Sequence, residues 1–181
     1  MQLLTNRIAL DEFILQMMRI PSPDLEVEQL QELIAQLDLN DNLLRQHICF
    51  SDRNYARKLL CRTSCFDMLV LCWYPGQFTT IHDHAGALNV TRVRSGVLTA
   101  RLFEPIEQGS SQNVLVRLCS EEYLERGDLA SVDRHQIHQL ANTSDEKLVT
   151  LHVYSPPLKN INVYCPNSGQ VNSVTLQYAL E

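Results

Sequence analysis

The sequence contains no apolar stretch long enough to cross a bilayer as a helix. Its longest apolar run extends only from Met68 to Tyr74, whereas a membrane-spanning helix needs about 20 residues. The first twenty residues interrupt their apolar stretch with Asp11 and Glu12 and have no cationic start, so we expect no signal peptide. These absences predict a protein without a membrane partner.

The sequence also lacks a CxxC pair, a common mark of zinc sites and dithiol redox sites. Its six cysteines are scattered at positions 49, 61, 65, 72, 119 and 165. The chain is longer than most domains that depend on disulfides for stability. We therefore expect reduced thiols and a cytoplasmic location.

No stripe of basic residues runs along the chain. The formal net charge is -6 over 181 residues, and acidic and basic residues are interspersed, so nucleic acid is not an expected partner. The sequence has no internal repeat, low-complexity tract or linker, and its length suffices for one buried core. It therefore predicts a single domain over residues 1–181 and leaves partner proteins open.

The first third of the chain has the apolar spacing of α-helices. Apolar residues recur at helical intervals over 11–19, and a second apolar stripe runs from Leu25 to Leu37. Between them, Ser22-Pro23 is typical of a helix start. A shorter helix is predicted over 53–60. We assign residues 1–62 to a helical N-terminal part.

From Phe66 onward, the periodicity changes to that of short β-strands separated by turn residues such as Pro75-Gly76 and Ser95-Gly96. Many short strands at near-regular spacing are typical of a sandwich or a barrel. Residues 63–181 are therefore predicted to form a mainly β structure, and the role of residues 161–181 is left open. The candidate strands are 66–74, 78–83, 88–95, 97–104, 113–119, 129–132, 135–141, 147–154, 161–165 and 171–177.

Two histidine-containing patterns lie within this β region. The first is Gly76-x5-His82-x-His84-x4-Asn89-x6-Gly96, and the second is Gly127-x5-Asp133-x-His135-x2-His138-x3-Asn142. Their spacings resemble the two motifs of the cupin superfamily, whose members are small jelly-roll β-barrels with a metal in the mouth of the barrel. The resemblance implies a cupin β-barrel with the N-terminal helices packed outside it.

His82 and His84 are two residues apart, which places both side chains on one face of a strand. Such a pair can hold one metal ion when a third ligand arrives from another strand. The resemblance makes His138 the third ligand and leaves His135 as a surface histidine. Where the first cupin motif normally has a Glu ligand, this chain has Asn89.

A site of three histidines without a carboxylate leaves the charge of the metal uncompensated by the protein. Such a centre favours an anionic ligand, and it lowers the pKa of a coordinated thiol, which then binds as the thiolate. Imidazole ligands suit Fe, Zn, Cu or Ni, so the ligands alone do not identify the metal.

A longer resemblance runs from Tyr55 to Pro157. The segments that carry it are Tyr55-x-Arg57, Leu71-Cys72-Trp73-x2-Gly76, Ile81-His82-Asp83-His84 and Leu151-His152-Val153-Tyr154-Ser155-Pro156-Pro157. These segments resemble the thiol dioxygenase family and, within it, the cysteine dioxygenases. The resemblance implies Fe(II) held by the three histidines. It also implies a small thiol, first of all L-cysteine, and O2 as substrates, with the sulfinic acid as product.

Thr150, His152 and Tyr154 alternate along the chain, so on a strand they share one face and, when buried, must bond one another. The resemblance makes them a chain in which Thr150 fixes His152, and His152 positions the Tyr154 hydroxyl beside the metal. It also makes Arg57, helped by Tyr55, the binding site of the substrate carboxylate, because a guanidinium matches a carboxylate in shape and charge.

The family pattern also bears on Asn89 and on Ser155-Pro156. In some members a cysteine stands at the Asn89 position and is crosslinked to the tyrosine that matches Tyr154. Because an asparagine cannot form a thioether, we predict no such crosslink. The Ser155-Pro156 bond is predicted to be cis, as in the matching segment of the family.

Two other functions remain open from the sequence. The first is a dioxygenase for 3-mercaptopropionate or another small thiol; such enzymes share the three histidines but commonly have Gln where Arg57 stands. The second is a non-enzymatic cupin that binds a metal or a thiol, since a fold does not fix a function. The pair His152 and Tyr154 argues against the second, because a binding site has no need of a buried hydroxyl aimed at the metal.

Overall fold

The computed structural model describes residues 7–39, 41–106 and 113–176, and every structural statement below refers to these residues. Three α-helices come first: α1 (Leu10–Arg19), α2 (Val27–Gln36) and α3 (Asp41–His47), with a short 3-10 helix at Ser22–Asp24. The strands that follow are β1 (Ala56–Arg62), β2 (Asp67–Trp73), β3 (His82–Asp83), β4 (Leu88–Ser95), β5 (Leu98–Ile106), β6 (Leu115–Leu124), β7 (Leu129–Val132), β8 (Ile137–Ala141), β9 (Leu148–Ser155), β10 (Asn160–Tyr164) and β11 (Val171–Thr175).

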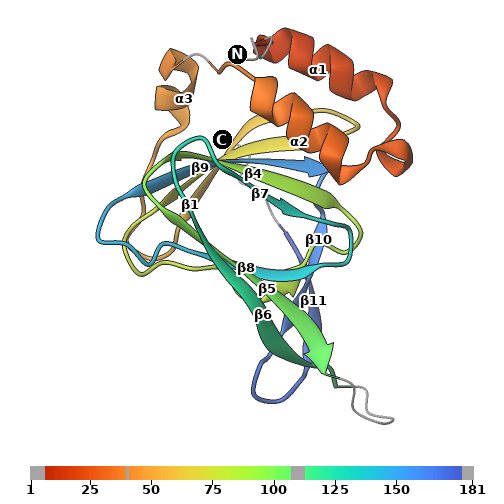
Figure 1. Ribbon diagram of the computed structural model, residues 1–181, viewed down its shortest axis with the longest axis vertical. Helices are drawn as coiled ribbons and strands as arrows, with labels where there is room; N and C mark the ends of the chain where they lie inside the picture. The colour runs from red at the N-terminus through yellow and green to blue at the C-terminus, as the bar shows by residue number, and fades with distance from the viewer. Residues whose placement is uncertain (1–6, 40, 107–112, 177–181) are drawn as a thin grey trace, which may run out of the picture.

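The strands form two antiparallel sheets beneath the N-terminal helices (Figure 1). The five-stranded sheet has the order β1-β2-β9-β4-β7, and the six-stranded sheet has the order β11-β10-β3-β8-β5-β6. This is a jelly-roll arrangement, so the predicted mainly β fold is confirmed. Within the described ranges, strand pairing does not join the two sheets into a closed barrel. Each of the two sheets therefore keeps open edges.

The five-stranded sheet is buried on both faces, and its side chains alternate between them. Along β2, Met68 and Val70 pack toward the helices, whereas Leu69 and Leu71 pack toward the second sheet. The strand β9 alternates in the same way, with Leu151 on the helix side. This two-sided burial explains why β2 is a continuous apolar run and not an alternation of apolar and polar residues.

Helices α1 and α2 cover the outer face of the five-stranded sheet (Figure 1). The helix α2 begins with a reciprocal capping box between Glu26 and Gln29. Arg92 of β4 donates to the main-chain oxygens of Ile34 and Leu37, at 3.2 and 2.8 Å, and so ties the end of α2 to the sheet. No helix of the described residues is long and apolar enough to span a membrane.

The predicted helix over 53–60 is wrong, because residues 56–62 form the edge strand β1. This strand pairs with β2 from Ala56 to Arg62, with one register shift between Leu59 and Cys61. Its side chains alternate accordingly: Leu59 packs inside the sandwich and Leu60 packs toward the helices. Pairing with a buried strand overrides the helical propensity of Ala, Arg, Lys and Leu. The helical part of the chain therefore ends with α3 at His47 and not at residue 62.

The other predicted strands are confirmed, β4 and β7 with the predicted bounds and the rest with shifted ends. The strand β3 covers two residues where the sequence predicts 78–83, and β6 continues to Leu124 where the sequence predicts an end at 119. Residue 177, the last of the final predicted strand, lies outside the described residues. Strand ends are set by pairing partners and turns, which a local pattern defines poorly.

The burial of α2 on the sheet generates a stability prediction. Ile34 is fully buried between α2 and the five-stranded sheet. We expect Ile34→Ala to lower the free energy of unfolding by about 2–5 kcal/mol, because it removes apolar contacts and leaves a cavity. Urea denaturation measures this difference. Leu15→Ala, on the exposed side of α1, is the matched control and should change stability little; equal effects of the two substitutions would contradict the described packing.

Candidate active site

Three buried histidines come together where β3 meets β8. His82 on β3 lies directly opposite His138 on β8 in the antiparallel register, and His84 follows His82 by two residues. The ring centroids are 4.5 Å apart for His82 and His138 and 4.7 Å apart for His84 and His138. One ring nitrogen of each histidine lies within 4.8 Å of the other two. The structure thus brings together the three histidines that the motifs select.

The ring nitrogens converge on a common point. Nδ1 of His82 donates to the main-chain oxygen of Thr80 at 2.8 Å, which leaves Nε2 of His82 as the ligand atom. The Nε2 atoms of His84 and His138 are 3.1 Å apart, a separation that suits two nitrogens bound to one ion at about 2.0–2.1 Å. Nδ1 of both rings is buried without a hydrogen-bond partner among the described residues. An ion bound at Nε2 would leave Nδ1 of each ring carrying the proton, so it is the close approach of the two Nε2 atoms that fits a metal site.

The three rings are held in the neutral state. Burial lowers the pKa of His82, His84 and His138 below the ordinary value for histidine. The positive charge of Arg57 lowers the pKa of His82 and His84 further, and the neighbouring histidines lower that of His138. A neutral imidazole has a lone pair to donate, so the site suits a transition-metal ion that prefers nitrogen ligands.

His135, the competitor for the third position, is exposed in the turn that precedes β8. Its side chain therefore lies at the surface, as predicted. The structure differs from the expectation in one respect, since His135 belongs to the turn and not to the strand itself.

Asp83, between the two histidines of the first motif, is a site residue that sequence analysis missed. Its buried carboxylate accepts hydrogen bonds from the Tyr164 hydroxyl at 2.6 Å, the Asn162 amide at 3.0 Å and the Ala85 main-chain nitrogen at 2.7 Å. Burial and the bond to Asp83 raise the pKa of Tyr164, which therefore keeps its proton. These bonds anchor the histidine segment to β10. In the sequence, the only sign of this anchor is that Asn162 and Tyr164 are two residues apart, which places them on one face of a strand.

Thr150, His152 and Tyr154 lie buried on the inner face of β9, as their alternation predicts. Thr150 Oγ1 is 2.8 Å from Nε2 of His152, and the Tyr154 hydroxyl is 3.3 Å from Nδ1 of the same ring. The Tyr154 ring stands edge-on to His84, with 5.1 Å between centroids. Burial lowers the pKa of His152 to about 3, so this ring is neutral. The three residues form one hydrogen-bonded chain that ends beside the clustered histidines.

Three residues outside the predicted set join this chain. Trp73 Nε1 donates to Thr150 Oγ1 at 2.9 Å. On β4, Thr91 Oγ1 lies 2.9 Å from Nδ1 of His152 and 3.1 Å from Oδ1 of Asn89. Asn89, which stands where the first cupin motif normally has Glu, therefore joins the chain of polar residues through its bond with Thr91.

Arg57 and Tyr55 reach the same interior from the edge of the five-stranded sheet. The Tyr55 ring stacks on Trp73, with 4.3 Å between centroids. A small cavity of about 50 Å³ joins both residues to the histidines and to Tyr154. Its lining consists of Tyr55, Arg57, Leu71, Thr79, Thr80, His82, His138, Leu140, His152, Tyr154, Leu158, Ile161 and Leu176. The cavity thus brings Arg57 and Tyr154 together with two of the clustered histidines, His82 and His138.

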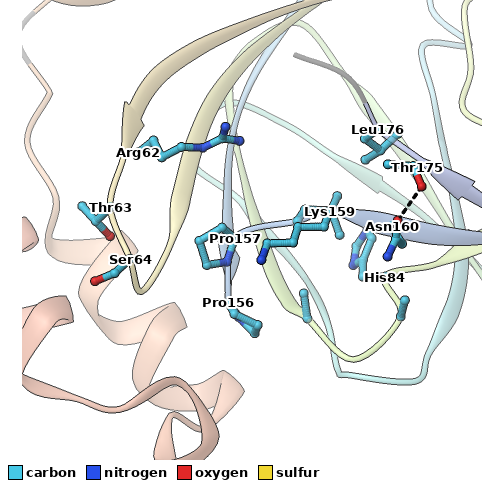
Figure 2. A pocket seen from close by; sticks show the side chains of 13 residues that line it. Arg62, Thr63, Ser64, His84, Pro156, Pro157, Lys159, Asn160, Thr175 and Leu176 are labelled. Atoms are coloured by element: carbon cyan, nitrogen blue, oxygen red, sulfur yellow. Dashed lines mark hydrogen bonds between the residues drawn. The ribbon is translucent and has the colours of Figure 1, made fainter.

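A larger cavity of about 690 Å³ adjoins the small one and reaches His84 (Figure 2). Leu158 and Leu176 line both cavities, so they separate the inner site from the outer space. Pro156 forms part of the outer wall, and the bond between Ser155 and Pro156 is cis, as predicted. The outer cavity offers small molecules a route toward the histidines.

Comparison with known proteins places these features in a family. A sequence profile described as cysteine dioxygenase type I matches residues 6–167. The chain is 27% identical to cysteine dioxygenase type 1 of Rattus norvegicus over 158 residues, which are 86% of this chain and 78% of that protein. It is 26% identical to cysteine dioxygenase type 1 of Homo sapiens over 160 residues, with the same two shares.

Solved structures support the fold alone. The protein TT1209 from Thermus thermophilus superposes with a TM-score of 0.53 and 19% identity, covering 66% of this chain and 97% of its own. A conserved protein with a double-stranded β-helix domain from Klebsiella pneumoniae superposes with a TM-score of 0.51 and 18% identity, covering 73% of this chain and 87% of its own.

The convergence of the three histidines generates a prediction about metal content. We expect His138→Ala to retain less than about a tenth of the metal that the unchanged protein binds, because two imidazoles cannot hold a transition-metal ion tightly. Mass spectrometry of metals after reconstitution and gel filtration measures the stoichiometry. His135→Ala changes the nearby exposed histidine and should keep full metal content. Loss of metal in His135→Ala and not in His138→Ala would refute the assignment.

Proposed function

The chain belongs to the cysteine dioxygenase type I family and is a thiol dioxygenase of cupin fold, and we propose that its substrate is L-cysteine and its metal Fe(II). In the proposed reaction both oxygen atoms of O2 become bonded to sulfur, and the thiol hydrogen leaves as a proton. The product is cysteinesulfinate. The electrons that reduce O2 come from sulfur, so no external reductant is consumed.

The observation that carries this proposal is the single cavity lined by Arg57, two of the clustered histidines and Tyr154. L-cysteine carries a carboxylate and a thiol within a few bonds of each other. A cavity of about 50 Å³ is far smaller than the several hundred Å³ typical of drug-sized ligands. It therefore favours a small thiol with one anionic group near the sulfur.

We propose that His82, His84 and His138 hold the metal. Bound Fe(II) would supply a Lewis acid that ionises the thiol and a centre at which O2 can react with sulfur. The neutral state of the three histidines supports this assignment, because they leave the positive charge available to a thiolate. No separate base is then needed to ionise the thiol.

We propose that Arg57 binds the substrate carboxylate. A guanidinium offers two parallel hydrogen bonds as well as charge, and both are strengthened in a cavity shielded from water. Tyr55 lines the same cavity, and its stacking on Trp73 fixes its ring. Together they would orient the substrate so that its sulfur faces the histidines.

We propose that Tyr154 donates a hydrogen bond to the oxygenated sulfur as negative charge develops on it. His152 and Thr150 would act behind it as positioning residues. The edge-on contact of Tyr154 with His84 supports this role, since it sets the phenol beside the proposed metal site.

One observation favours 3-mercaptopropionate as a second candidate substrate. The described lining of the small cavity contains no carboxylate. The ammonium group of cysteine would therefore find no acidic partner there and would have to bind as the neutral amine. A thiol without an amine avoids this requirement, whereas both thiols carry the carboxylate that Arg57 would bind.

We also propose a cytoplasmic location. The six cysteines are free thiols in the structure, and burial raises the pKa of Cys72, which keeps that thiol protonated. Unpaired cysteines of this number are typical of a reducing compartment.

Oxygen uptake tests the proposed reaction directly. We expect protein reconstituted with Fe(II) under anaerobic conditions to consume one O2 per cysteinesulfinate formed, measured with an oxygen electrode and by mass spectrometry of the product. A parallel assay with 3-mercaptopropionate ranks the two substrates. Zinc-loaded protein is the control and should consume no O2. Absence of uptake with both thiols at full iron content would refute the proposed function.

The proposed binding of the substrate carboxylate by Arg57 has its own test. We expect Arg57→Gln to lower kcat/KM for L-cysteine about 10- to 100-fold, because a charge-assisted bond to the carboxylate is lost. Use of cysteamine, which has no carboxylate, should change little. Arg53→Gln, at an exposed position nearby, is the matched control and should behave as the unchanged protein. Equal losses of kcat/KM with L-cysteine and with cysteamine would mean that Arg57 does not bind the substrate carboxylate.

A further inference from the structure

Strand β4 pairs with β9 in the five-stranded sheet (Figure 1). Asn89 and Thr91 of β4 lie across from the polar residues of β9. In the antiparallel register Asn89 is opposite Tyr154, and Thr91 is opposite His152. Both β4 side chains are buried, with 1% and 0% of their surface exposed. They therefore face the interior on the same side of the sheet as the active-site chain.

The bonding of Asn89 fixes which way its side chain points. Its Nδ2 donates to the main-chain oxygen of Val153 at 3.1 Å, so Oδ1 is left as an acceptor. The Thr91 hydroxyl donates to that Oδ1 at 3.1 Å. A hydroxyl has one hydrogen, so Thr91 has none left to donate to His152.

The contact between Thr91 and His152 therefore has one direction. The Thr91 oxygen lies 2.9 Å from Nδ1 of His152, and because it can only accept there, Nδ1 must carry the proton. Neutral imidazole then has its lone pair on Nε2. Nε2 accepts from the Thr150 hydroxyl at 2.8 Å. Thr150 in turn accepts from Trp73, whose indole nitrogen can only donate.

The position of the proton on His152 also determines whether Tyr154 can donate a hydrogen bond to that ring. The Tyr154 oxygen lies 3.3 Å from Nδ1 of His152. A protonated Nδ1 has no lone pair, so Tyr154 cannot donate there and at most shares the one hydrogen that Nδ1 directs to the nearer Thr91 oxygen. The hydroxyl hydrogen of Tyr154 is directed to an acceptor other than His152. Tyr154 lines the small cavity, where the proposed substrate would provide that acceptor.

We propose that Asn89 and Thr91 are positioning residues that hold His152 with its proton on Nδ1, so that Tyr154 serves as a hydrogen-bond donor to the substrate. The part concerning substrate rests on the proposed function, whereas the protonated nitrogen of His152 is a property of the protein alone. The bond that Trp73 donates to Thr150 is compatible with this direction, since it leaves the Thr150 hydrogen available to Nε2 of His152. Neither Asn89 nor Thr91 touches the substrate cavity in the described lining.

Nitrogen NMR of the histidine side chains tests the direction without any need for activity. In zinc-loaded protein, which is diamagnetic, a long-range nitrogen–hydrogen correlation reports which nitrogen of His152 carries the proton. We expect the proton on Nδ1 in the unchanged protein. In Asn89→Leu the freed Thr91 hydroxyl can donate to Nδ1, so a form protonated on Nε2 should appear. A proton on Nε2 in the unchanged protein would overturn the proposal.

A double-mutant cycle tests whether the pair acts through Tyr154. We expect Asn89→Leu to lower kcat for thiol oxidation about tenfold with little change in KM. In a Tyr154→Phe background the same substitution should lower kcat less than about twofold, because the hydroxyl that it positions is gone. Equal losses in both backgrounds would mean a merely structural role and would overturn the proposal.

Threonine variants keep the test decisive if Asn89→Leu does not fold. Thr91→Val should lower kcat severalfold, and Thr91→Ser, which keeps the hydroxyl, should restore it. Thr99→Val removes a buried hydroxyl elsewhere, bonded to Thr143 at 2.6 Å, and should leave kcat unchanged. Failure of Thr91→Ser to restore activity would overturn the proposal. If the unchanged protein oxidises no thiol, the proposed function fails, while the NMR result still decides the protonated nitrogen.

Discussion

The candidate active site depends on the register of β9, a strand that is buried on both faces. Its odd-numbered residues from 149 to 153 pack against the helices, and Thr150, His152 and Tyr154 face the interior. Because side chains alternate along a strand, a shift of one residue would exchange the two sets and bury three polar groups against apolar helices. The apolar packing of the outer face therefore fixes the polar geometry of the inner face.

The charges of the residues that line the small cavity limit the kinds of ligand that it can bind. The described lining of the small cavity combines Arg57 with neutral histidines and contains no carboxylate. The one carboxylate between the metal histidines, that of Asp83, is bonded to β10 and the adjacent turn. A bound cation would add to the positive charge of Arg57 in a site of low dielectric. Such a site is complementary to a ligand with two anionic groups, as in a thiolate that also bears a carboxylate.

The sequence led to the three clustered histidines by two routes. The spacing of His82 and His84 places both on one face of a strand, and the resemblance to the cupin motifs pointed to His138 and not to His135. The strand β1 could not be found this way, because its residues favour a helix locally and become a strand only by pairing with β2. The bonds of Asp83 were equally invisible, since Asn162 and Tyr164 lie 79 and 81 residues away.

Asn89 departs from the pattern of the family, and a second residue, Thr91, connects it by hydrogen bonds to the polar chain of β9. Some thiol dioxygenases carry a cysteine there that crosslinks to the active-site tyrosine, and an asparagine cannot form that bond. Asn89 lies opposite Tyr154 in the register, yet its side chain bonds Val153 and Thr91. The link from position 89 to the tyrosine thus passes through Thr91 and His152 as hydrogen bonds. Such a link requires every donor to point the same way, and in this chain the amide of Asn89 and the hydroxyl of Thr91 meet that requirement, since Thr91 donates to Asn89 and can only accept from His152.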